Sequence, residues 1–216
     1  MAGFSALLLS GCATQSKVSR GLATSEPVPA MYGAIPDELF PIPAVDTSML
    51  ASQYWRQIVD DPTGERSGTI VVDTPNRFLY VVREGGKALR YGVGVGREGF
   101  SWAGEGRIAW KRKWPTWTPP AEMITRQPEL EPYRDGMAPG LDNPLGARAL
   151  YIFEGNRDTL YRLHGTNEPQ SIGKAVSSGC IRLINQDVID LYDRVPVATR
   201  IVVIPDPNAP VHMHVS

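Results

Sequence analysis

Hydrophobic and polar positions alternate in short runs from Gly68 onward, which is the pattern of half-buried β-strands. The expected strands are Thr69–Val72, Phe78–Val82, Ala88–Val95, Ala149–Phe153, Thr159–His164 and Arg200–Ile204. The turn sequences Asp73-Thr74-Pro75-Asn76 and Glu84-Gly85-Gly86 separate the first three runs, so we expect two successive hairpins there. The sequence therefore predicts a mainly β (α+β) fold.

One helix is expected shortly after the last cysteine of the chain. Asn185 is a suitable N-cap, and Asp187 favours the positive end of the helix dipole. Pro196 ends the pattern. The apolar face of this helix is expected to consist of Val188, Leu191, Tyr192 and Val195.

The rest of the chain is irregular. Residues 13–44 are rich in Ser, Thr, Pro and Gly without periodicity, which indicates a flexible tether. A second irregular stretch, 111–146, is long enough to suggest a functional loop. We expect a signal at 1–12, a tether and N-terminal extension at 13–67, a folded domain at 68–206 and a tail at 207–216.

Composition narrows the class of protein. The chain has 216 residues, of which 42% are hydrophobic and 21% charged, and this suits one globular domain. A net charge of −1 gives no reason to expect nucleic acid as a partner. The apolar run Phe4–Leu9 is too short to span a bilayer.

Cys12 follows this run in Leu9-Ser10-Gly11-Cys12, which matches the lipobox of a bacterial lipoprotein. Lipidation of Cys12 would anchor the protein to a membrane. Ala13 favours the outer membrane of a Gram-negative envelope, so the expected location is the periplasm. The alternative is an ordinary start of the chain with a buried Cys12.

Cys180 is the remaining cysteine, and it lies in Ser177-Ser178-Gly179-Cys180, a polar sequence typical of a tight turn. A thiol attacks as thiolate, so a nearby base must take its proton, and His164 at the end of an expected strand is the candidate. Backbone N–H groups of the turn would stabilise an oxyanion. Taken singly, a histidine and a buried cysteine are more often structural; together they favour a Cys-His acyltransferase.

Several further motifs resemble the L,D-transpeptidase (YkuD) catalytic domain family, over about residues 68–204. The motifs that carry the resemblance are His164-Gly165-Thr166-Asn167, Ser171-Ile172-Gly173, Ser177-Ser178-Gly179-Cys180-Ile181-Arg182-Leu183 with Asn185, Gly92-Val93-Gly94-Val95-Gly96 and Asn143-Pro144-Leu145-Gly146-Ala147-Arg148-Ala149-Leu150. The resemblance implies a β-sandwich with a helix after the cysteine loop.

The resemblance also implies a reaction without cofactors or metal. Cys180 would attack the third residue of a peptidoglycan tetrapeptide stem, with His164 as base, and expel the terminal D-alanine. An amine of another stem, or of an envelope protein, would take the acyl group. The backbones of Gly179 and Cys180 would form the oxyanion hole. Substrate contacts are expected from Arg182, Ser177, Ser178, Gly165, Thr166 and Asn185.

Two alternatives remain: a hydrolase using the same site, and a non-catalytic wall-binding lipoprotein. The second arises because the family commonly has a histidine where Ser178 stands. The family's usual loop after the second hairpin is also replaced, by Trp102-Ala103-Gly104-Glu105-Gly106.

Three other features have open interpretations. Trp114 and Trp117 form either a cleft wall or a hydrophobic cluster. Lys111-Arg112-Lys113 is expected to be a solvated patch, with attraction to an acidic cell wall as the alternative. His212 and His214 have a spacing that suits a metal, but no third ligand is evident, so we expect no metal site.

Overall fold

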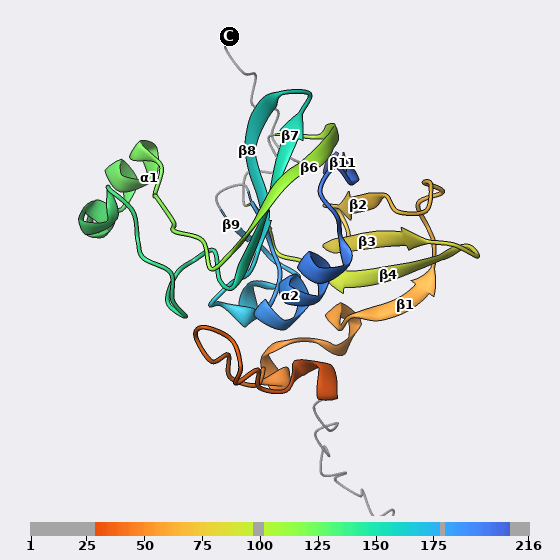
Figure 1. Cartoon of the computed structure of the whole chain (residues 1–216), viewed down its shortest axis with the longest axis horizontal. Coiled ribbons are helices and arrows are strands. Elements are labelled where there is room, and N and C mark those ends of the chain that lie inside the picture. Colours follow the sequence, from red (N-terminus) through yellow and green to blue (C-terminus); the bar gives the residue numbers. More distant parts are fainter. Residues whose placement is uncertain (1–28, 97–101, 178–179, 208–216) are drawn as a thin grey trace, which may run out of the picture.

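The computed structural model describes residues 29–96, 102–177 and 180–207, and within them the fold is mainly β (Figure 1). A large sheet has nine strands and a small one has two. In spatial order the large sheet contains β1 (Gln57–Asp60), β4 (Lys87–Gly92), β3 (Phe78–Arg83), β2 (Ile70–Asp73), β11 (Arg200–Ile204), β6 (Gly104–Lys113), β7 (Arg148–Glu154), β8 (Arg157–His164) and β10 (Ile181–Arg182). The small sheet pairs β5 (Val95–Gly96) with β9 (Ala175–Ser177).

The two expected hairpins are confirmed as β2–β3 and β3–β4. Ile70 lies opposite Val81, which in turn lies opposite Leu89. Asp73 organises the first turn, because its side chain accepts a hydrogen bond of 3.1 Å from the backbone N–H of Asn76. The alternating sequence pattern was sufficient to find these strands.

The large sheet bends over its own core. In Figure 1, β6, β7 and β8 stand side by side, and β1 to β4 run across them to one side. Side chains from both halves meet in one cluster, which helix α2 (Asn185–Arg194) completes. The two layers of the expected sandwich are thus halves of one continuous sheet. The fully buried members from β6, β7, β8 and α2 include Ile108, Leu150, Ile152, Leu163, Val188 and Leu191.

Strand β6 lies between β11 and β7, and the sequence pattern did not reveal it. It contains two glycines and five charged residues, which are poor strand formers in isolation. Of its side chains only Ile108 is fully buried. Pairing with two neighbours therefore creates this strand, and local preference does not.

Residues 29–56 pack on the domain, so the expectation of a flexible tether does not hold from Pro29 onward. Tyr32 is fully buried, and Ile42 is 3% exposed. Ile35 and Ile42 form a β-bridge, which folds the segment back on itself. We call residues 29–56 the N-terminal belt. Residues 1–28, including Cys12, lie outside the described residues.

The expected helix exists and ends at Arg194, before Pro196. Its N-terminus differs from the expectation, because Ile184 occupies the cap position and no side chain caps the helix there. At the other end, Lys111 Nζ donates to the carbonyls of Tyr192 at 2.6 Å and Val195 at 2.7 Å. Lys111 therefore caps the C-terminus of α2 and is not part of a solvated patch.

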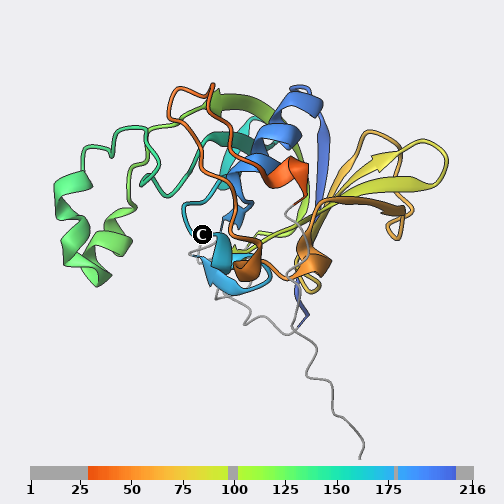
Figure 2. The same cartoon turned by 90° about the horizontal axis from the view of Figure 1, so that it is seen from below.

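Residues 114–146 form a long excursion that projects from one side of the domain, as Figure 2 shows. It carries helix α1 (Ala121–Arg126) and a 3₁₀ helix, Pro128–Tyr133. Asn143 is fully buried at its base, and its amide donates to the carbonyls of Pro115, Met137 and Ala138. The base of the excursion is thus held by a satisfied polar side chain.

Trp114 belongs to a hydrophobic cluster. It is 6% exposed, packs with Ile42 and Ala147, and donates from Nε1 to Glu38 at 2.8 Å. Phe40 of the belt meets its ring edge-on at 4.8 Å. The cluster reading of Trp114 is therefore correct, and the belt supplies half of the cluster.

Candidate active site

Cys180 directly precedes strand β10, which pairs with β8, and His164 ends β8 on the same face of the sheet. β10 runs parallel to β8, with Ile181 opposite Leu163, so Cys180 is level with Arg162. Ile181 and Leu163 point into the core, and the residues flanking them therefore point outward. A strand spacing of ~4.8 Å and two residues of ~3.3 Å place the Cα atoms of Cys180 and His164 roughly 8 Å apart. Two side chains can bridge that distance.

The imidazole of His164 is buried and held by backbone carbonyls. It is 4% exposed, and its Nδ1 lies 2.5 Å from the carbonyl oxygen of Gly165. A carbonyl accepts only, so Nδ1–H donates, and Nε2 is left as the proton acceptor. Burial, helped by the charges of Arg182 and Arg162, lowers the pKa of His164 to about 4. The ring is therefore neutral at physiological pH, as a general base requires.

The Cys180 thiol is half-buried and forms no disulfide in the described part of the chain. Burial raises its pKa, while the backbone N–H of Arg162 and the charges of Arg162 and Arg182 oppose that rise. Thiol and imidazole are thus both neutral at rest. A pair in these protonation states can transfer the proton during an attack by the thiol, and the two guanidinium charges favour the thiolate form.

Three residues that sequence reasoning missed form a stack beside Cys180, which we call the aromatic row: Trp110, Tyr151 and Arg162. They are cross-strand neighbours on β6, β7 and β8. The rings of Trp110 and Tyr151 are 3.4 Å apart at 12°, and the Arg162 guanidinium lies 4.3 Å from the Tyr151 centroid. Asp158 fixes Arg162 with two hydrogen bonds of 2.7 and 2.8 Å. Only pairing registers could have predicted this row, because its members are far apart in sequence.

The other predicted substrate residues differ in their placement. Arg182 is on the outer face, next to the thiol, and its guanidinium pairs with the exposed carboxylate of Glu168 at 2.6 Å. Thr166 is 2% exposed, and its hydroxyl accepts a hydrogen bond from the Glu168 backbone. Ser177 ends β9, level with Gly96. Ser178 and Gly179 lie outside the described residues, so one of the two residues expected to form the oxyanion hole, Gly179, cannot be placed.

Asn185 contacts the backbone segments next to His164. Its Oδ1 accepts a hydrogen bond of 2.9 Å from the backbone N–H of Ala147. It also lies against two glycines, since a Cβ at either Gly146 or Gly165 would come within 2.3 Å of Oδ1. Asn185 is 9% exposed and thereby fixes the backbone that follows His164.

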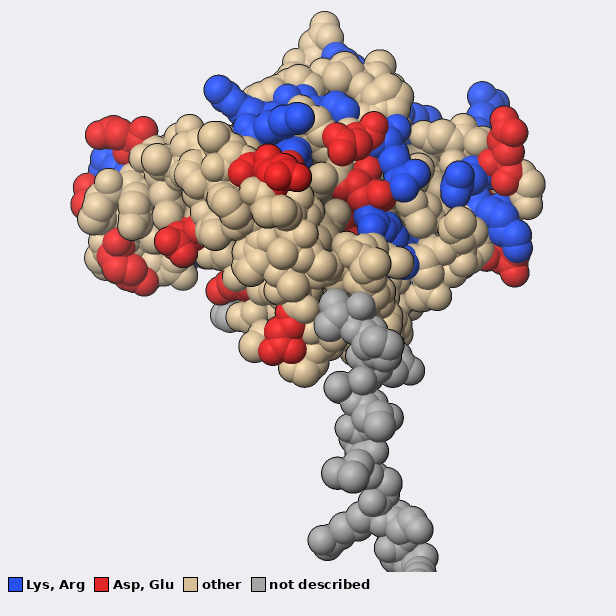
Figure 3. Space-filling model, turned by 60° about the horizontal axis from the view of Figure 1, so that its bottom comes forward, with Lys and Arg blue, Asp and Glu red and all other residues tan. Residues whose placement is uncertain are grey.

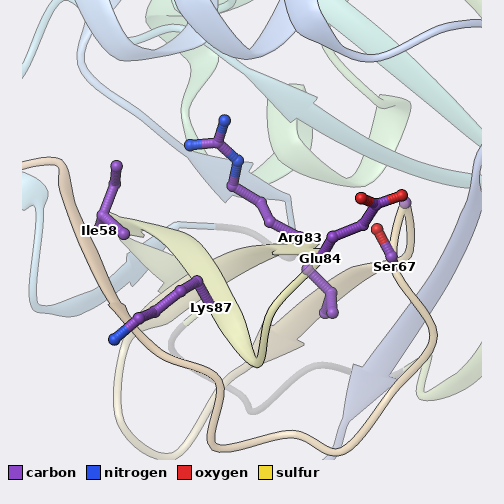
Figure 4. A pocket seen from close by; sticks show the side chains of 7 residues that line it. Ile58, Ser67, Arg83, Glu84 and Lys87 are labelled. Atoms are coloured by element: carbon purple, nitrogen blue, oxygen red, sulfur yellow. The ribbon is translucent and has the colours of Figure 1, made fainter.

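No group of three metal-ligating side chains occurs in the described ranges, and His212 and His214 lie outside them. A shallow depression of about 510 Å³ lies between β1 and the β3–β4 turn, lined by side chains such as Ile58, Glu84 and Lys87 (Figure 4). It is at the opposite edge of the sheet from Cys180.

The charges of the molecule are mixed. Figure 3 shows acidic and basic side chains side by side on one face, as expected from the near-zero net charge. Among the described residues, no helix has the length and apolar character needed to cross a membrane.

The L,D-transpeptidase catalytic domain (YkuD) matches residues 67–204 of the chain. The chain therefore belongs to this family, and the match contains both Cys180 and His164.

Curated relatives carry the same family name. The chain is 34% identical over 151 residues to "Probable L,D-transpeptidase YbiS" of Escherichia coli K12, a match covering 68% of the chain and 47% of the relative. It is 37% identical over 150 residues to "Probable L,D-transpeptidase ErfK/SrfK" of Salmonella typhimurium, covering 68% and 47%. The chain thus spans about half the length of these relatives.

Among solved structures, one from Brucella melitensis is 46% identical, with a TM-score of 0.50. The match covers 74% of the chain and 99% of that protein, whose structure is described as a "Probable carnitine operon oxidoreductase caia". This description names a different activity from that of the curated relatives.

Proposed function

We propose that the protein is a cysteine acyltransferase acting on peptidoglycan stem peptides, that is, an L,D-transpeptidase. The observation that carries the proposal is the shared face of Cys180, which directly precedes β10, and His164, which ends the parallel neighbour β8. Membership of the family supports it, since the matched residues contain this pair.

In the proposed reaction, Cys180 Sγ attacks the carbonyl of the third stem residue while Nε2 of His164 takes the thiol proton. The tetrahedral oxyanion is stabilised by backbone N–H groups, for which Gly179 and Cys180 are the candidates. The proton then passes to the leaving D-alanine amine, which leaves a thioester. An amine of a second stem or of an envelope protein attacks this thioester and restores the thiol.

Arg182 is proposed to bind a carboxylate of the stem. It already pairs with the exposed Glu168 on the outer face, so a substrate carboxylate would exchange with Glu168. We propose an envelope location, in the periplasm with Cys12 lipidated, because the substrate is there and Cys12 stands in a lipobox sequence. Asn185 acts in this scheme as a positioning residue and Thr166 as part of its support.

Product analysis tests the proposal. The protein is incubated with purified tetrapeptide stems, and cross-linked dimers are expected from wild type and none from Cys180→Ala. Tripeptide without dimers would indicate hydrolysis, which is the second candidate because water can attack the same thioester. Turnover retained by Cys180→Ala would refute the proposal and favour a non-catalytic role for the thiol.

A further inference from the structure

The aromatic row leads from the nucleophile across three strands to the surface. Cys180 is level with Arg162, Arg162 pairs with Tyr151, and Tyr151 pairs with Trp110. The row therefore connects the reacting thiol with the outer side of β6, on the face that Cys180 shares. In Figure 1, β6, β7 and β8 stand in this order beside one another.

Trp110 is the member of the row that remains available to a ligand. Tyr151 is enclosed between the indole and the guanidinium and is only 9% exposed, whereas Trp110 is 39% exposed. An indole ring presents a large, rigid apolar surface at low entropic cost. The apolar C–H face of a pyranose ring is a flat partner of matching size.

The distance from Cys180 to Trp110 matches the length of a stem peptide. Three strand spacings of ~4.8 Å place the two residues about 14 Å apart. Three extended residues of ~3.5 Å span about 10 Å, and the lactyl ether that joins the stem to its sugar adds a few ångströms more. A stem whose third carbonyl is at the thiol therefore brings its sugar to Trp110.

Positive charge prevails beside this path, although Asp158 offsets the charge of Arg162. Arg112 is exposed, lies two residues beyond Trp110 on β6, and forms no salt bridge with another described residue; Lys113 beside it is exposed too. Burial raises the pKa of Tyr151, whereas the charge of Arg112 acts to lower it, against the opposite effect of Asp158, so Arg112 lies near the row. This charge complements the carboxylates of an acyl-donor stem and disfavours a cationic amine acceptor.

We propose that Trp110 is a sugar subsite that binds the N-acetylmuramic acid ring of the donor strand. The inference rests on the proposed function and specifies the substrate further: the enzyme prefers stems still attached to glycan over free stem peptides.

The test compares kcat/KM for the free tetrapeptide and for the disaccharide-tetrapeptide. Wild type is expected to have about tenfold higher kcat/KM for the disaccharide form, which is the fold-change that the free energy of one good stacking contact produces. Trp110→Ala should lose this preference, measured as the ratio of the two kcat/KM values within the variant, and Trp110→Phe should keep most of it. Ile58→Ala, which removes an exposed apolar side chain on β1 at the far edge of the sheet, is the matched control.

Equal kcat/KM for both substrates in wild type would overturn the proposal, as would an equal loss on both in Trp110→Ala. A titration distinguishes failure of the sugar subsite from failure of the proposed function. The peptide-free disaccharide is added to Cys180→Ala, and a saturable shift of the Trp110 indole N–H resonance is expected. Absence of a shift at millimolar sugar would overturn the subsite, whereas a shift combined with no turnover by the wild-type protein would refute only the transpeptidase proposal.

Discussion

Replacing Asn185 with alanine tests how the site is supported. The substitution removes the acceptor of the buried Ala147 N–H, whose bond to Oδ1 is 2.9 Å long. Leaving a buried donor without a partner costs about 1–3 kcal/mol. For a domain of this size, a loss of about 2 kcal/mol lowers Tm by roughly 4–8 °C.

The same substitution should also impair catalysis. Oδ1 lies against Gly165, whose carbonyl holds Nδ1 of His164. Freeing this backbone lets the imidazole leave the proton-accepting orientation, so we expect kcat to fall about tenfold with little change in KM. Gln186→Ala is the matched control, because that buried amide binds the carbonyls of Gly33 and Pro43 on the N-terminal belt.

The assay measures thermal unfolding and steady-state kinetics on the same preparations. Both variants should lose stability, and only Asn185→Ala should lose kcat. A wild-type Tm for Asn185→Ala together with a raised KM would show that Asn185 contacts substrate, as the family resemblance implied, and would refute the positioning argument.

Three further predictions concern stability. Burial raises the pKa of Asp187 to about 7, so the folded state retains a proton that the unfolded chain releases near 3.8. Wild type should therefore lose stability relative to Asp187→Asn as pH rises from about 4 to 7. Urea titrations in which the stability difference between the two proteins does not change with pH would contradict this. Gly173→Ala should cost more stability than Gly85→Ala. Both glycines have positive φ, but only at Gly173 would a Cβ meet a ring, that of Tyr54, at 2.3 Å. Equal losses of Tm in the two variants would show that this steric clash does not affect stability. Lys111→Met should lower the unfolding free energy by about 1–2 kcal/mol by uncapping α2, and an unchanged urea midpoint would contradict the capping role.

The strands that alternate in sequence were predictable, and those made by their neighbours were not. The first two hairpins and the strand Arg200–Ile204 follow from local alternation of apolar residues. β6 has a polar sequence and becomes a strand because β11 and β7 supply its hydrogen bonds. β1, at the edge, is likewise defined by its pairing with β4.

The prediction of a flexible tether was wrong for the N-terminal belt for a related reason. Prolines and small polar residues do forbid a regular helix there, and the belt contains only short 3₁₀ turns. Order comes from separated apolar residues such as Tyr32 and Ile42, each of which fills a gap on the domain. Isolated anchors of this kind have no periodicity that a sequence pattern can detect.

At the site, the motif located the two groups proposed to react, and tertiary pairing determined their surroundings. Cys180 and His164 were expected to be neighbours, and the register of β10 and β8 makes them so. The aromatic row, the Asp158 carboxylate and the support from Asn185 depend on contacts across strands and helices. These contacts carry no local signal in the sequence.

The most direct test of the account is the intact mass of the protein during turnover of a tetrapeptide stem. We predict a transient adduct with the mass of the tripeptide acyl group, mapped to Cys180 by peptide digestion. Its rate of formation should be greatly reduced in His164→Gln. An adduct on another residue, or one that forms at the wild-type rate without the imidazole, would contradict the account.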